Sequence, residues 1–169
     1  MENMDDTVAY TFDSEGYVII DDFLYEDVVN ELHDLAVNHT DIDDVYPNDG
    51  YHSINFDKNN LPFDVLADVI NAIHVTFSPL HNLEFDRGWA FVYDSSAHGV
   101  TPHADPAAVN VNLWVTSNDS LKDPTQNGLI IYDKKPPEDW VWDQYNSDTD
   151  GIKRYLKESG AKARYVPYN

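Results

Sequence analysis

A strand is predicted for the stretch Ala108-Val-Asn-Val-Asn-Leu-Trp-Val-Thr116, where apolar residues alternate with asparagine. The stretches Trp89 to Tyr93 and Leu129 to Tyr132 are also strand-like, and loops rich in Ser, Asn, Asp, Gly and Pro separate the three. Ala163 to Tyr168 predicts a final strand. The second half of the chain is therefore expected to be mainly a run of strands.

The first half of the chain carries helical patterns. Apolar residues recur every three or four positions from Glu26 to Val37 and from about Pro62 to Val75, which predicts two amphipathic helices. The short β-branched run Val18 to Asp22 predicts a buried strand before them. Asn38 to Asn60 has many Asp, Asn and Pro residues and little periodicity, which indicates a long loop or a lid. Asp150 to Ser159 predicts one more short helix.

Helices followed by antiparallel strands indicate an α+β fold around a sandwich or barrel. With 169 residues and 42% hydrophobic content, residues 1–169 are expected to form a single domain with a packed core. The chain has no cysteine, which excludes disulfides, thiolate zinc sites and cysteine nucleophiles. Any metal must therefore be bound by histidine, carboxylate or water.

The net charge of −21, from 31 acidic and 10 basic residues, argues against nucleic-acid partners, because phosphate binding needs clustered Lys and Arg. No apolar run approaches the roughly 20 residues of a membrane span. The start of the sequence, Met1 to Asp6, is acidic, which does not resemble a secretory signal. We expect a cytoplasmic protein without a membrane partner.

Two His-x-Asp triplets occur among the seven histidines. His39-Thr-Asp41 lies in an acidic stretch, where such a pairing arises by chance. His103-Ala-Asp105 precedes the strand predicted at Ala108, so both side chains can project from a strand end into one cleft. On an extended segment they share a face and supply two ligands of a two-histidine, one-carboxylate site for non-haem Fe(II). The third ligand must come from a distant strand.

Tyr93, Asn112 and Trp114 are candidates for the wall of this cleft. Asn112 and Trp114 would share one face of the predicted strand, and Tyr93 ends the preceding one. The alternative is that Trp114 fills the core while Asn110 and Asn112 satisfy backbone groups. Both interpretations stay open on the sequence alone.

The remaining histidines are weaker candidates as ligands. His98 could act as a substitute ligand, although its Ser-Ser-Ala-His-Gly setting favours a surface residue, and His52 in the long loop is weaker still. His74 and His81 are expected to be solvated or hydrogen-bonded. Two tryptophans that follow Pro136-Pro137 are expected to anchor a loop by packing, namely Trp140 and Trp142.

Most of the chain resembles the Fe(II)- and 2-oxoglutarate-dependent oxygenases of the prolyl-hydroxylase-like family. The resemblance lies in an ordered series of segments: Gly16 to Leu24, Gly88 to Tyr93, His103-Ala-Asp105, Val109 to Thr116, Asn127 to Asp133, Pro137 to Trp140 and Arg164 to Asn169. It implies a double-stranded β-helix of jelly-roll type with the N-terminal helices packed on it. It also implies that His103 and Asp105 bind Fe(II), that Tyr93 and Asn112 contact 2-oxoglutarate, and that oxygen is activated while 2-oxoglutarate is decarboxylated.

The chain departs from this family in one respect, since no histidine follows His103. The family takes its distal histidine from a later strand, and a basic residue further on holds 2-oxoglutarate. Arg154 and Arg164 are the only later arginines, and both precede the place expected for that residue. We therefore expect a C-terminally incomplete domain that is inactive alone. An exposed strand edge is then expected to favour a homodimer.

The alternative function is a non-catalytic jelly-roll module for metal binding or assembly. In it, His103 and Asp105 are structural or bind an adventitious divalent ion, since such a pair also accepts Mn, Ni, Co or Zn. A cupin that binds a sugar or a small acid ranks lower, because its paired histidines and later glutamate are not visible. The sequence does not indicate which small molecule or peptide would be the substrate.

Overall fold

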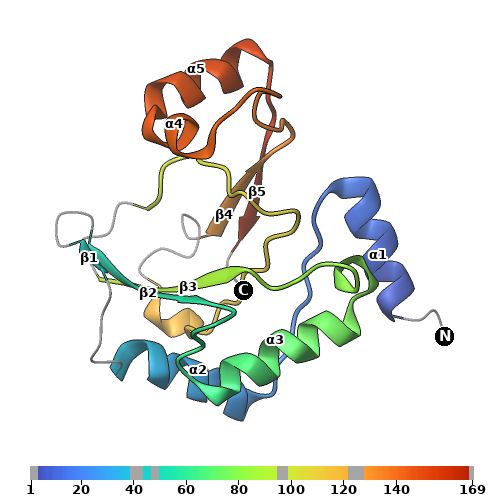
Figure 1. The fold of residues 1–169 in the computed structure, drawn as a ribbon, viewed down its shortest axis with the longest axis vertical. Coiled ribbons are helices and arrows are strands. Elements are labelled where there is room, and N and C mark those ends of the chain that lie inside the picture. Colours follow the sequence, from blue (N-terminus) through green and yellow to red (C-terminus); the bar gives the residue numbers. More distant parts are fainter. Residues whose placement is uncertain (1–3, 39–43, 47–49, 95–98, 122–127, 168–169) are drawn as a thin grey trace. The chain divides into compact units, whose positions relative to one another are not determined.

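The computed structural model describes residues 4–38, 44–46, 50–94, 99–121 and 128–167 (Figure 1). The chain divides into two compact units, Met1–His98 and Gly99–Asn169, and each is described by itself. The first unit contains the elements α1 (Met4–Glu15), α2 (Glu26–Asn38), β1 (Asp44–Tyr46), β2 (Tyr51–Asp57), α3 (Asp64–Thr76), the 3-10 helix η1 (Ser78–Leu80) and β3 (Arg87–Tyr93). The second contains η2 (Asn118–Ser120), β4 (Gly128–Tyr132), α4 (Trp142–Ser147), α5 (Thr149–Glu158) and β5 (Ala163–Pro167).

The first unit is built on an antiparallel sheet in the order β1-β2-β3. Strands β2 and β3 pair along their whole length, from Tyr51 opposite Tyr93 to Asp57 opposite Arg87. Burial alternates along β3, as the period of two in a strand requires. Three of the four more exposed positions of β3 hold aromatic side chains, Trp89, Phe91 and Tyr93, and the Phe91 and Tyr93 rings are 6.2 Å apart.

The core of the first unit lies between its helices and the opposite sheet face. Val69 and Ile73 of α3 are buried and lie four residues apart, so both occupy one helix face. Leu32 of α2 and Ile54 of β2 are buried as well. Phe77, which follows α3, is buried with its ring 5.2 Å from that of Phe23. The helical periodicity therefore predicted α2 and α3, but the apolar stripe expected for the second helix, Phe63, Leu66, Ile70 and Ile73, includes only one of its two buried residues and leaves out Val69.

The second unit pairs β4 with β5 in an antiparallel ladder, from Gly128 opposite Pro167 to Tyr132 opposite Ala163. The two helices α4 and α5 follow one another directly, with Asp148 between them. The Asp148 carboxylate caps α5 by accepting a hydrogen bond from the Gly151 amide at 2.8 Å. Ile152 of α5 is 2% exposed, which makes it the most buried apolar residue of this unit among the described residues.

Three predicted elements differ from the structure. The strand predicted for residues 18–22 does not form, and Asp22 adopts a positive φ of 53° that ends the extended run in a turn. Residues 108–115 form no strand either, because the described residues provide them with no ladder partner. The expected loop of residues 38–60 contains β1 and β2, since Ile54 and its neighbours pair with β3. Two further helices, α1 and α4, were not predicted.

The mixed α+β class is confirmed, with antiparallel sheets of three and two strands among the described residues. The predicted helices over residues 26–37, 62–75 and 150–159 correspond to α2, α3 and α5. The predicted strands over residues 89–93, 129–132 and 163–168 correspond to β3, β4 and β5, of which Tyr168 lies outside the described residues. Within the described part of the chain, no helix has the length and apolar character that crossing a membrane demands.

Candidate metal site

The His103-Ala-Asp105 triplet lies between two prolines in an irregular segment of the second unit. Proline lacks a backbone N–H, and Pro102 and Pro106 therefore cannot donate to a helix or a ladder. The residue before a proline is also restricted to extended conformations, which applies to Thr101 and Asp105. The local sequence thus favours an extended, unpaired backbone at the triplet.

The middle residue of the triplet is held by a side chain from α4. The Ala104 amide donates to Asn146 Oδ1 at 3.0 Å, and Asn146 Nδ2 donates to the Ala104 carbonyl at 2.9 Å. Both partners are partly buried. The primary amide of Asn146 therefore pairs with Ala104 as a neighbouring strand would. Sequence reasoning missed Asn146, because no local pattern connects residues 42 positions apart.

The His103 ring has a defined orientation. Its Nδ1 lies 2.8 Å from the Thr101 carbonyl oxygen, which can only accept, so Nδ1 carries the hydrogen. In the neutral imidazole, Nε2 then presents its lone pair, and that nitrogen lies 3.9 Å from Asp105 Oδ1. A hydrogen bond from the second ring nitrogen to a carbonyl is the usual support of a metal-binding histidine.

The Asp105 carboxylate is oriented in a similar way. Asn110 Nδ2 donates to Asp105 Oδ2 at 3.0 Å, which leaves Oδ1 on the side of His103. The side chains of His103 and Asp105 are 44% and 27% exposed, so an ion can reach both from solvent. Asn110 was considered in the sequence only as a partner for backbone groups, whereas the structure gives it a carboxylate partner.

The donor set fits a divalent cation with a small adjustment. Two ligand atoms about 2.1 Å from one ion and at right angles to each other are about 3.0 Å apart. The distance of 3.9 Å between His103 Nε2 and Asp105 Oδ1 must therefore shorten, which side-chain rotation can provide. Among the described residues, no group of three or more His, Cys, Asp or Glu side chains is placed to hold a metal. His103 and Asp105 would supply two donors, with water at the other positions.

The two residues predicted to contact 2-oxoglutarate, Asn112 and Tyr93, lie in different units of the chain. Asn112 is exposed in the same irregular segment as Asn110. Tyr93 belongs to the first unit, where its ring lies 5.5 Å from that of Tyr51. Burial, with a smaller contribution from Tyr51, raises the pKa of Tyr93 above its usual value. The contact of these two residues with 2-oxoglutarate stays a prediction. Trp114 is 36% exposed, so it does not fill a core in the described structure.

The other histidines differ in their surroundings. His39 and His98 lie outside the described residues. His52 lies on β2 opposite Val92, so the prediction that it belongs to a loop was wrong. His81 Nε2 lies 3.4 Å from the Val75 carbonyl oxygen. The Nε2 atom of His74 is buried without a hydrogen-bond partner in the described part of the chain, which contradicts the expected solvation or hydrogen bonding.

The two tryptophans near Pro137 pack as predicted. The Trp140 ring meets the Tyr145 ring edge-on at 5.6 Å, and Trp142 begins α4 with its Nε1 atom buried. Burial, with a smaller contribution from Tyr155, raises the pKa of Tyr145.

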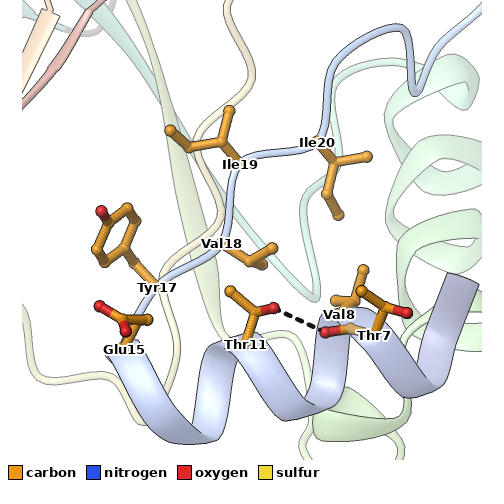
Figure 2. Close-up of a pocket in the computed structure, with 8 residues that line it drawn as sticks. All are labelled: Thr7, Val8, Thr11, Glu15, Tyr17, Val18, Ile19 and Ile20. Atoms are coloured by element: carbon orange, nitrogen blue, oxygen red, sulfur yellow. Dashed lines mark hydrogen bonds between the residues drawn. The ribbon is translucent and has the colours of Figure 1, made fainter.

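A separate cavity of about 440 Å³ lies in the first unit, between α1 and the extended segment that follows it (Figure 2). Four of its eight lining residues are aliphatic, and the Thr11 hydroxyl donates within the helix to the Thr7 carbonyl at 2.9 Å. The lining residues are Thr7, Val8, Thr11, Glu15, Tyr17, Val18, Ile19 and Ile20. None of them was a candidate for chemistry in the sequence.

Comparison of the chain with known proteins finds no matching family model, no matching curated protein and no matching solved structure. The case for a metal site therefore rests on the residues and geometry of this chain.

Proposed function

We propose that the chain is an Fe(II)- and 2-oxoglutarate-dependent oxygenase domain of the hydroxylase type, with His103 and Asp105 as iron ligands. The observation that carries the proposal is the arrangement of this pair. His103 Nε2 and Asp105 Oδ1 lie 3.9 Å apart, and the other polar atom of each side chain is already hydrogen-bonded. Two donors directed toward the same point by their own hydrogen bonds are the basis of a metal site.

The roles of the chain's own residues follow from this geometry. Thr101 accepts from His103 Nδ1 and so keeps Nε2 free of a hydrogen, while Asn110 turns Oδ1 of Asp105 toward the same place. On the sequence resemblance, and not on this geometry, Tyr93 and Asn112 are also proposed to contact 2-oxoglutarate with their phenol and amide groups. Iron, when bound, would coordinate 2-oxoglutarate and activate oxygen. The double-stranded β-helix core belongs to the proposal, and the antiparallel pairing within both sheets supports it.

The number of protein ligands limits the strength of metal binding. His103 is the last histidine of the sequence, so these residues provide two of the family's three ligands in their usual order. A site with fewer protein ligands binds its ion less tightly, and we expect weak, reversible binding. The same fact favours a second candidate function, a non-catalytic module that binds a divalent ion at His103 and Asp105.

The experiment that separates these functions is calorimetric titration of 2-oxoglutarate into the chain with and without Mn(II), a redox-stable substitute for Fe(II). The oxygenase proposal predicts that 2-oxoglutarate binds only when Mn(II) is present and that Asp105→Ala abolishes this binding. Asp34→Ala, which removes an exposed carboxylate beside His33, is the matched control and should change nothing. Metal binding without any binding of 2-oxoglutarate would contradict the proposal that this chain binds 2-oxoglutarate and would favour the module.

A further inference from the structure

The side chain of Asn146 makes two hydrogen bonds to one residue of the proposed metal site. Asn146 Oδ1 accepts from the Ala104 amide at 3.0 Å, and Asn146 Nδ2 donates to the Ala104 carbonyl at 2.9 Å. Ala104 is the residue between His103 and Asp105, and its own side chain is a single methyl group. The contact therefore acts on the backbone that carries the two proposed ligands.

The triplet has few other backbone anchors. Because Pro102 and Pro106 carry no N–H, the segment from 102 to 106 has three backbone donors, and Asn146 takes the middle one. Without Asn146, the backbone N–H and C=O groups of Ala104, which has no ladder partner, would be hydrogen-bonded only by water. The direction of His103 and Asp105 thus depends on a residue outside their segment.

Asn146 belongs to the helix α4, which Figure 1 labels beside α5, and contacts within the second unit support this helix. The helix α4 is closed by the bond from the Tyr145 amide to the Val141 carbonyl at 2.8 Å and is supported by the ring contact between Tyr145 and Trp140. A ligand segment tied to such an element is more precisely placed than one supported by its own loop alone.

We infer that Asn146 is a positioning residue of the metal site, which fixes the Ala104 backbone so that His103 and Asp105 present Nε2 and Oδ1 to one ion. The inference rests on the proposed function. Side chains two residues apart on an extended segment point to the same side, so pinning the middle residue sets the direction of both. Loss of a supporting contact outside the ligands typically weakens metal binding by about 10–100-fold.

The test compares Mn(II) binding by the wild type, Asn146→Ala and Asn146→Leu, followed by the electron paramagnetic resonance signal of free Mn(II). The leucine variant keeps the branched shape of the side chain and removes both hydrogen bonds. We expect about 10–100-fold weaker binding in both variants. Ser147→Ala is the control on the same helix, because it removes only the exposed bond from the Ser147 hydroxyl to the Gln144 carbonyl. It should bind Mn(II) as the wild type does.

A second control distinguishes positioning from general destabilisation. Ile152→Val removes one methylene from a residue that is 2% exposed and lowers the stability of the same unit without touching Ala104. It should leave Mn(II) affinity unchanged. If Ile152→Val weakens binding as much as Asn146→Ala does at equal loss of thermal stability, the inference is overturned.

Hydrogen exchange of the Ala104 amide gives a readout that needs no metal. In the wild type this amide should be protected, and in Asn146→Ala it should exchange faster while amides inside α5 keep their protection. Unchanged Ala104 exchange, or normal Mn(II) binding by both Asn146 variants, overturns the inference alone. Absence of Mn(II) binding in the wild type overturns the proposed function as well.

Discussion

Substitution of Asn110 by alanine is expected to weaken metal binding without removing a ligand. Asn110 Nδ2 donates to Asp105 Oδ2 at 3.0 Å, and this bond holds Oδ1 on the side of His103 Nε2. Without it, the carboxylate can rotate and divide its time between orientations. Binding of the ion must then also fix the orientation of the Asp105 carboxylate, and this entropy cost weakens the binding.

The expected size follows from the exposure of the contact. Hydrogen bonds to charged groups contribute about 1.5–3 kcal/mol, and the exposed setting of this bond places it at the lower end. A loss of about 1.4 kcal/mol corresponds to a tenfold higher dissociation constant for Mn(II). Removing the amide from Asn110 should therefore raise that constant roughly tenfold, within the range known for contacts that orient metal ligands.

The assay is calorimetric titration of metal-free protein with Mn(II), repeated in the presence of 2-oxoglutarate. Asn112→Ala is the matched control, because it removes the same group two residues further along the same segment. It should leave the affinity for Mn(II) alone unchanged and should weaken only the binding of 2-oxoglutarate. The reasoning is refuted if Asn110→Ala binds Mn(II) as tightly as the wild type, or if both variants lose metal affinity equally.

Three further predictions concern the framework around the site. Gly128→Ala should lower the unfolding free energy measured in urea by roughly 1–3 kcal/mol. The reason is that Gly128 has a φ of 146° and that an added Cβ would overlap the Val166 carbonyl oxygen. An unchanged urea midpoint would contradict the β4–β5 pairing. Burial raises the pKa values of Tyr93 and Tyr145, so the folded chain keeps its phenol protons after the unfolded chain has lost them. The unfolding free energy should therefore fall as the pH rises above about 10. In urea titrations over that pH range, Tyr93→Phe should show a smaller fall than the wild type. A larger fall would contradict this prediction. Two copies of the chain should associate through the two-stranded β4–β5 sheet, where Ile130 is 55% exposed. Light scattering at micromolar concentration should show a dimer, and Ile130→Lys should dissociate it. A monomeric wild type would contradict this prediction.

The elements that the sequence predicted correctly have a periodicity that local packing reinforces. In α3, the expected apolar stripe contains Ile73, which is buried, but not Val69, which is more buried still, so the pattern predicted the helix more accurately than its buried face. In β3, the more exposed positions alternate with less exposed ones as in any half-covered strand. These patterns are present in the sequence before any tertiary contact is known.

The elements that were predicted wrongly depend on partners that the sequence does not specify. Residues 108–115 alternate like a strand, but a strand also needs a neighbouring strand to pair with, and the described residues provide none. The Asn110 side chain in this segment donates a hydrogen bond to Asp105. The strand β2 was hidden by surrounding Asp, Asn and Pro residues, and its pairing with β3 overrides their preference for turns. Asp22, with its positive φ, ends a β-branched run that otherwise resembles a strand.

The candidate site could be predicted only in part for the same reason. His103 and Asp105 are two residues apart, so their common direction follows from the local backbone. Asn146 reaches Ala104 across 42 residues of chain and through the packing of α4, which no spacing rule anticipates. The proposed ligands were thus visible in the sequence, whereas the residue that holds their backbone was not.

The central claim is that His103 and Asp105 together bind a divalent ion, and the most direct measurement is a Mn(II) titration of the wild type beside His103→Ala and Asp105→Ala. Because 31 acidic residues attract cations unspecifically, His33→Ala serves as the control, since it breaks an exposed pair in which His33 Nδ1 lies 3.4 Å from Asp34 Oδ1. We expect a saturable Mn(II) site in the wild type and in His33→Ala, and no such site in His103→Ala or Asp105→Ala. Equal Mn(II) binding by all four proteins would contradict it.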